Sequence, residues 1–319
     1  MRTSATDVRE LREGFFKLSQ AKLFLALSRT PHGLLDLATP VLAAFLALGA
    51  VPSFRVVILG FIAALAGYTA VYALNDLIDY HTDRERMALS DSKEDRDYLD
   101  AVFVRHPVAL GLLSFKQGVV WMATWAALGF FAAYLLNPVC ALILILGCVL
   151  EVIYCRMLTV SHLRALVSGI VKTLGGVAAV FAVNPDPPML FLITLFLWIF
   201  FWEIGGQNIP ADWHDLEKDQ RFGAKTIPVR YGTTRAGAIT FLCLALSTGL
   251  SVFLLRASSV QVSFSFLLLS LVAGIYLLLV PAYRLYRTGA HADTSALFNR
   301  ASYYPLAVLA IIGIQIILS

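Results

Sequence analysis

The amino-acid sequence predicts an all-α protein that crosses a membrane nine times. Of its 319 residues, 59% are hydrophobic and only 14% are charged, and the mean hydropathy is +0.75. A soluble domain of this length does not need so much apolar surface. The net charge of +4 is modest and gives no reason to expect a nucleic-acid partner. We therefore expect a single polytopic domain over residues 1–319, with the lipid bilayer as its surroundings.

Apolar stretches long enough to span a bilayer recur along the chain. A transmembrane helix needs roughly 20 apolar residues. The third and fourth stretches are separated only by Asn137-Pro138, which predicts a tight turn. The nine expected spans are residues 30–50, 54–78, 117–136, 138–155, 162–183, 187–208, 234–255, 260–283 and 302–318.

The basic residues predict how these spans are oriented. With nine spans, the N-terminus and the loops after spans two, four, six and eight share one side, and 22 of the 25 Lys and Arg fall there. The positive-inside rule makes that side cytoplasmic, at the inner membrane if the protein is bacterial. The long connections 79–116 and 209–233 lie on the same side, so we expect the active-site loops there. Residues 1–20 are expected to be a cytoplasmic segment, either an interfacial amphipathic helix or a mobile tail.

The segment YALNDLIDYHTD, residues 72–83, places polar side chains at the end of the second span. Asn75, Asp79 and Asp83 are four residues apart and share one helical face, with Asp76 beside the first. Carboxylates at this spacing repel each other unless a cation compensates, and a set of oxygen ligands suits Mg²⁺. The alternative is a solvated helix end, but acids near membrane depth are costly and are usually functional.

A second acidic array follows the sixth span on the same side. Asp212, Asp215 and Asp219 are three and then four residues apart, and the acids of the first array have the same spacing. Two such arrays facing each other would hold two or three Mg²⁺ ions around a diphosphate and stabilise a leaving group. Arg221 and Lys225 lie just downstream and are candidate phosphate-binding cations, although topology-determining charge explains each of them equally well.

Five segments, in order along the chain, match the motifs of one protein family. They are TPHGLLDLATP, NDLIDYHTD, HPVALGLLS, YCRMLTVSHL and DWHDLEKDQRFGAKT. With these segments the chain resembles the UbiA superfamily of intramembrane prenyltransferases. The paired acidic motifs are the specific part of the likeness, whereas any one segment alone is a weak signal.

This resemblance implies a ring of nine helices around a central cavity and Mg²⁺-dependent transfer of a polyprenyl group from a polyprenyl diphosphate. The acceptor in the family is often an electron-rich aromatic ring, so a lipophilic or aromatic acceptor and a role in quinone biosynthesis are expected. The implied metal ligands are Asn75, Asp79, Asp83, Asp212, Asp215 and Asp219. The implied catalytic residues are Asp79, Asp83, Asp215, Asp219 and Tyr154. The candidate diphosphate-binding residues are Asn75, Asp76, Asp212, Arg156, Lys172, Arg221 and Lys225.

Two features depart from the family pattern. The family often has Lys or Arg shortly after the position of Tyr154, where this chain has Leu158 and Thr159; Arg156 and Arg164 are possible substitutes. The connection after the first acidic motif is long and acidic, and an Arg-Pro pair is replaced by His106-Pro107. For this connection we expect a solvated surface loop, with a lid as the alternative.

Ionisable residues also occur inside the predicted spans, where they usually face a polar cavity or pair with one another. Asp36 and Glu203 are candidates for orienting the acceptor or removing its proton. A structural ion pair with Lys172 explains each of them equally well.

Three other functions remain open. A UbiA-type terpene cyclase would keep both acidic motifs but need no acceptor. A phosphoribosyl-type transferase would use a lipid phosphate and a sugar diphosphate. A membrane transporter is disfavoured, because transporters bind near the midplane and both acidic arrays lie at one face.

Overall fold

The computed structural model describes residues 19–88, 98–101 and 103–318. Within these ranges the protein is helical and contains no β-strand. Nine helical segments of the described chain are long and apolar enough to cross a membrane. The predicted class, an all-α polytopic membrane protein, is therefore confirmed. The expected N-terminal cytoplasmic segment lies almost entirely outside the described residues.

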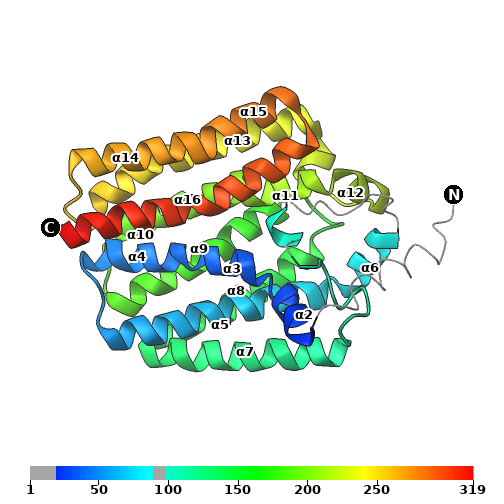
Figure 1. Cartoon of the computed structure of the whole chain (residues 1–319), viewed down its shortest axis with the longest axis horizontal. Coiled ribbons are helices and arrows are strands. Elements are labelled where there is room, and N and C mark those ends of the chain that lie inside the picture. The colour runs from blue at the N-terminus through cyan, green and yellow to red at the C-terminus, as the bar shows by residue number, and fades with distance from the viewer. Residues whose placement is uncertain (1–18, 89–97, 102, 319) are drawn as a thin grey trace.

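The helices lie mostly along the long axis of the molecule (Figure 1). In the first half of the chain they are α2 (Gln20–Leu27), α3 (Thr30–Asp36), α4 (Ala38–Leu48), α5 (Phe54–Ile78), α6 (Tyr80–Ala88), η1 (Leu99–Ala101), α7 (Phe115–Leu136), α8 (Pro138–Arg156) and α9 (Arg164–Val183). The second half forms α10 (Met189–Glu203), η2 (Ile204–Asn208), α11 (Ile209–His214), α12 (Leu216–Phe222), α13 (Ile227–Ala257), α14 (Phe264–Gly274), η3 (Ile275–Leu279), α15 (Val280–Thr288) and α16 (His291–Leu318). Helix α5 packs on α7, α9 packs on α4, α8 and α10, and α16 packs on α4, so the last span touches the first.

The first span is broken in the middle, between α3 and α4. Pro40 has no N–H group, and its ring clashes with the carbonyl of the residue four positions earlier, which is Asp36. The helix therefore ends at Asp36 and restarts at Ala38. Helix α3 packs on α5, and a Cβ atom on Gly33 would lie 3.6 Å from the Tyr72 ring. This break brings the carboxylate of Asp36 to the hydroxyl of Tyr72.

The sixth span contains one π-helical turn, η2, directly after Glu203. A π turn changes the direction in which the following side chains point, and such turns are frequent at functional sites. Gly205 in this turn lies against α13: a Cβ atom there would be 2.9 Å from the carbonyl oxygen of Thr240. The glycine therefore permits the close approach of the π turn to α13.

Four spans extend clearly further toward the acidic end than the sequence predicts. The sixth runs to His214, the seventh starts at Ile227, the eighth runs to Thr288, and the ninth starts at His291. An apolar stretch marks only the part of a helix that lies in lipid, and these helices continue as polar caps beyond it. The seventh is kinked at Gly232, whose φ is +78°.

Replacing Gly205 by Ala should destabilise the fold. The added methyl group meets the Thr240 carbonyl and the Leu244 side chain, both at 2.9 Å, and overpacking of this kind costs about 1–3 kcal/mol. Gly249→Ala is the matched control, since a Cβ atom on this helical glycine meets nothing within 4 Å. Thermal unfolding in detergent measures both; equal unfolding temperatures would contradict the packing argument.

Candidate functional site

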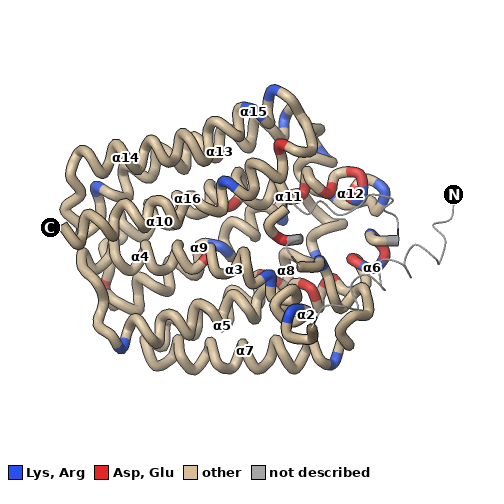
Figure 2. Tube along the Cα trace, viewed as in Figure 1, with Lys and Arg blue, Asp and Glu red and all other residues tan. Residues whose placement is uncertain are grey.

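The two acidic motifs lie at the same end of the bundle. Figure 2 shows acidic residues gathered there, around α6 and α12, which pack against each other. In each motif the middle acid sits at a junction between two helices: Asp79 between α5 and α6, and Asp215 between α11 and α12. The hydrogen bonds to the residue four positions earlier continue through both junctions. The predicted ladders are thus interrupted helices, built alike in both halves of the chain.

The side chain of Arg86 joins the two motifs. Its guanidinium lies 3.6 Å from Asp83 and 3.6 Å from Asp215, and it donates a short hydrogen bond to Asp219. Arg105 adds a bidentate pair to Asp215, with distances of 3.2 and 2.9 Å. Acids that are separated by more than a hundred residues therefore form one cluster.

His106 holds the first motif from the other side. Its Nδ1 atom lies 2.8 Å from Asp76 and 2.7 Å from Asp83. Burial acts to lower the pKa of His106, but the carboxylates of Asp83 and Asp76 outweigh burial and raise it to about 9. His106 is therefore an imidazolium at neutral pH, and it supplies positive charge where the family pattern has an arginine.

The acids differ in how fully these cations compensate them. Burial, together with the neighbouring Asp83, raises the pKa of Asp79 to about 6. Burial also raises the pKa of Asp219 to about 7, even though Arg86 opposes the shift. The pKa of Asp215 is well below its ordinary value, because Arg105 and Arg86 outweigh the effect of burial. Asp79 and Asp219 thus have capacity for a further cation.

The oxygen atoms of the cluster fit a hard divalent cation. Asp76, Asp212 and Asp219 each carry a buried Oδ2 atom with no hydrogen-bond partner among the described residues. Mg²⁺ favours carboxylate oxygens and completes its shell with water and phosphate oxygens. Asp76, Asp83 and His106 also place potential ligand atoms within 4.8 Å of one another. A protonated histidine is not a metal ligand, so the carboxylates are the better donors.

Tyr154 and Asn75 lie at the inner edge of this cluster. Tyr154 accepts a hydrogen bond from Asn208 at 3.1 Å, and Arg164 stacks on its ring at 4.0 Å. Arg164 also donates to Asp212 at 2.8 Å. The Oδ1 atom of Asn75 accepts a hydrogen bond from the guanidinium group of Arg29 at 3.1 Å, so this candidate metal ligand is already engaged.

Four predicted diphosphate-binding residues lie apart from the acidic cluster. Arg156, Arg221 and Lys225 are exposed and lie outside the lining of the cavity. Lys172 lines the cavity deeper in the bundle. Arg86 was not among the predicted site residues. Its position three residues after Asp83 could have indicated it, because this spacing places the two side chains on one helical face.

The described end of the acidic connection is packed, not solvated. Tyr98 is 2% exposed and stacks on the ring of His214. The carboxylate of Asp100 forms ion pairs with Arg29 at 3.4 Å and with His32 at 2.7 Å. The expected solvated surface loop is therefore wrong for residues 98–100, and residues 89–97 lie outside the described part.

One cavity of about 530 Å³ joins these features. Its mouth, which we call the acidic mouth, is lined by Asp79, Asp83, Asp212 and Asp215. Away from this mouth, between α4, α5, α8 and α9, the lining is mostly apolar and includes Phe45, Phe61, Leu144 and Leu174. A molecule with a charged head and a hydrocarbon tail matches this division.

The chain is similar to proteins of one family along most of its length. The UbiA prenyltransferase family matches residues 37–303. The digeranylgeranylglyceryl phosphate synthase of Thermococcus kodakarensis is 25% identical over 236 residues, which cover 74% of this chain and 78% of that protein.

Two solved structures show the same fold. A UbiA homologue from Aeropyrum pernix K1 is 20% identical, with a TM-score of 0.67 over 90% of this chain and 97% of that one. A UbiA homologue from Archaeoglobus fulgidus, bound to DMAPP and Mg²⁺, is 17% identical, with a TM-score of 0.64 over 91% and 99% of the two chains. The predicted fold and enzyme class are confirmed at the level of the family: the chain is a multi-pass membrane protein that belongs to the UbiA prenyltransferase family.

Proposed function

We propose that this protein transfers a polyprenyl group from its diphosphate to an acceptor inside the membrane, and that it needs Mg²⁺. The observation that carries the proposal is the meeting of both acidic motifs at the mouth of a cavity whose inner lining is mostly apolar. The Archaeoglobus homologue bound to DMAPP and Mg²⁺ supports a prenyl diphosphate donor and this metal. Such a donor would place its diphosphate at the acidic mouth and its tail against the apolar side chains of the inner cavity.

The proposed metal ligands are the acids of the two motifs. Asp79, Asp83, Asp215 and Asp219 form the core of the set, with Asp212 and Asp76 offering further buried oxygens. Bound Mg²⁺ would neutralise the diphosphate as the allylic C–O bond breaks. Arg86 and Arg105 are then available as hydrogen-bond donors to the phosphate oxygens, as charged guanidinium groups commonly are.

Tyr154 has a positioning role in this proposal. Arg164 covers one face of its ring, and Asn208 binds its hydroxyl group. Through these contacts Tyr154 holds Arg164 against Asp212, which belongs to the second acidic motif. The apolar walls around the reacting carbon exclude water and protect an allylic cation.

The identity of the acceptor separates two candidate functions. An aromatic acceptor, as in quinone biosynthesis, agrees with the polar groups that line the inner part of the cavity. The Thermococcus relative is named digeranylgeranylglyceryl phosphate synthase, so a lipid glycerol phosphate is the second candidate. A UbiA-type cyclase would release a hydrocarbon and diphosphate without either acceptor.

We also infer the topology and the domain organisation. The acidic end carries most of the described basic residues outside the spans (Figure 2), which supports a cytoplasmic location for this end and for the N-terminus. The packing of α16 on α4 supports one domain over residues 1–319. In a bacterium the membrane would be the cytoplasmic membrane.

Asp79→Asn and Asp215→Asn should each lower kcat/KM for prenyl transfer by about 100-fold or more, the usual scale for losing one group that stabilises developing charge. Membranes with labelled geranyl diphosphate, Mg²⁺ and a panel of acceptors provide the assay, and EDTA should abolish product in the wild type. The exposed Glu217→Gln is the matched control. Full activity of either aspartate variant would rule out the proposed site.

Arg86→Gln should make the stability of the protein depend on Mg²⁺. Without metal, the variant leaves the buried Asp219 without its ion-pair partner, whereas Asp215 keeps Arg105, and such a loss costs about 3 kcal/mol. With millimolar Mg²⁺ the difference from the wild type should shrink, because the metal supplies the missing charge. Chemical unfolding in detergent measures this, with the exposed Arg84→Gln as control; an equal loss with and without Mg²⁺ contradicts the metal site.

Fusion reporters test the topology. Nine spans and a cytoplasmic N-terminus put the C-terminus on the opposite side. In a bacterial host, alkaline phosphatase fused after Ser319 should be active, and a green fluorescent protein at the same place should stay dark. The reverse pair of results would invert the proposed orientation.

A further inference from the structure

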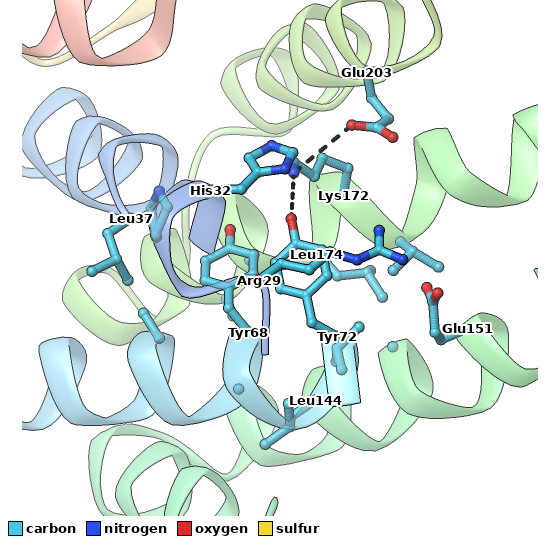
Figure 3. A pocket seen from close by; sticks show the side chains of 18 of the residues that line it. Arg29, His32, Leu37, Tyr68, Tyr72, Leu144, Glu151, Lys172, Leu174 and Glu203 are labelled. Carbon is cyan, nitrogen blue, oxygen red and sulfur yellow. Dashed lines mark hydrogen bonds and ion pairs between the residues drawn. The ribbon is translucent and has the colours of Figure 1, made fainter. Parts of the chain in front are cut away.

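The charged side chains deep in the cavity are paired with one another. Figure 3 shows Lys172 between the Tyr72 hydroxyl, at 3.4 Å, and the Glu203 carboxylate, at 3.9 Å. Lys172 also donates a hydrogen bond to Asp36 at 2.7 Å. Such pairing is the usual arrangement for ionisable groups within membrane spans. A charged residue of a span that lacks a partner in the chain therefore indicates contact with something outside it.

Arg300 in the ninth span is such a residue. It is exposed, and it is the only charged side chain between Thr294 and Leu318. It forms no ion pair with any described residue, and its guanidinium carbon lies 5.7 Å from the centroid of the Tyr276 ring. The neighbouring Phe298 and Ala301 are buried on the other side of α16, so Arg300 is directed toward lipid.

The guanidinium of Arg300 lies within the depth of the hydrocarbon. Arg300 precedes the end of its span at Leu318 by eighteen positions, which is about 27 Å along a helix. Tyr276 follows the start of its span at Phe264 by twelve positions, or about 18 Å. A hydrocarbon core is about 30 Å thick. The pair therefore lies inside the core, in the half nearer the acidic mouth.

The helices beside Arg300 offer it no acid. The elements α14, η3 and α15 pack on α16, and none of them contains Asp or Glu. Along α16 the nearest acid is Asp293, about 10 Å away, and Arg284 pairs with it at 2.8 Å. Arg287, one turn beyond Arg284, is exposed as well. These three arginines and one aspartate give what we call the α15–α16 face a net charge of +2.

The chemistry of the α15–α16 face matches that of a phospholipid. A lipid phosphate is the anion available at this depth, and a guanidinium binds phosphate with paired hydrogen bonds. Tyr276 and Tyr303, which are 61% and 48% exposed, flank Arg300, and tyrosine is enriched at the level of lipid head groups. The exposed Val272 and Leu306 continue these two rows away from the mouth and offer apolar contact to acyl chains.

We propose that Arg300 binds the phosphate group of an anionic phospholipid in the half of the bilayer nearer the acidic mouth. The net charge of the face favours such a lipid over a zwitterionic one, whose ammonium group Arg284 and Arg287 repel. The adjacent Asn299 accepts a hydrogen bond from the backbone of Leu99 at 3.0 Å. The bound lipid thus stabilises the helix that holds the described end of the acidic connection.

Native mass spectrometry tests this binding without turnover. The purified protein in detergent is titrated with dioleoyl phosphatidylglycerol and, separately, with dioleoyl phosphatidylcholine. We expect the wild type to bind phosphatidylglycerol about 10-fold more tightly, the scale of a hydrogen bond between charged groups. Arg300→Gln should lose most of this preference. Lys116→Gln removes the same charge from an exposed site on α7, at the same end of the bundle, and should keep the preference.

The other outcomes overturn the proposal. Equal affinity of the wild type for the two lipids removes the preference for negative charge. A preference that survives in Arg300→Gln places the anionic lipid elsewhere, such as in the cavity. A dimer that disappears in Arg300→Gln assigns the face to a second copy of the chain. A lower unfolding temperature of Arg300→Gln without added lipid makes the residue structural. None of these measurements depends on prenyl transfer, so the proposed function stands or falls separately.

Discussion

Compensation of buried carboxylates is the constraint on which the acidic end of this protein depends. Acids in a low-dielectric region are costly unless cations lie against them. Arg86 and Arg105 reach the second motif, and His106 reaches the first. These three residues lie on the connection between spans two and three, so the connection is held onto the end of the bundle by charge. These contacts keep Arg86, Arg105 and His106 against the buried acids.

The same constraint explains the break in each acidic motif. A straight helix would direct its acids along one line, at fixed spacing and away from the opposite motif. The junctions at Asp79 and Asp215 turn the chain across the end of the bundle. Helix α6 consequently meets α12, and Arg86 can contact acids of both motifs. The two acidic motifs, one in each half of the chain, thereby form one site.

Local patterns in the sequence predict much of this architecture. The lengths of the apolar stretches predict the nine spans, and the repeated spacing of the aspartates identifies both motifs. Both patterns involve residues that are close together in the chain. The partners of these acids are not predictable in this way, because Arg86 and Asp219 are 133 residues apart. The same holds for Lys172: the sequence leaves Asp36 and Glu203 as equal partners. The break caused by Pro40 and the contact with Tyr72 favour Asp36.

The distribution of charge along the cavity determines the direction in which a prenyl diphosphate can bind. The acidic mouth contains three strong cations, Arg86, Arg105 and His106, and acids suited to divalent metal. Deeper in the cavity, Lys172 is paired with Asp36 and Glu203, and most of the side chains that line this part are apolar. An inverted donor would place its hydrocarbon tail among the charged side chains of the acidic mouth and its diphosphate beside the Glu203 carboxylate. In the proposed function the donor would therefore bind in a single orientation, with its diphosphate at the acidic mouth.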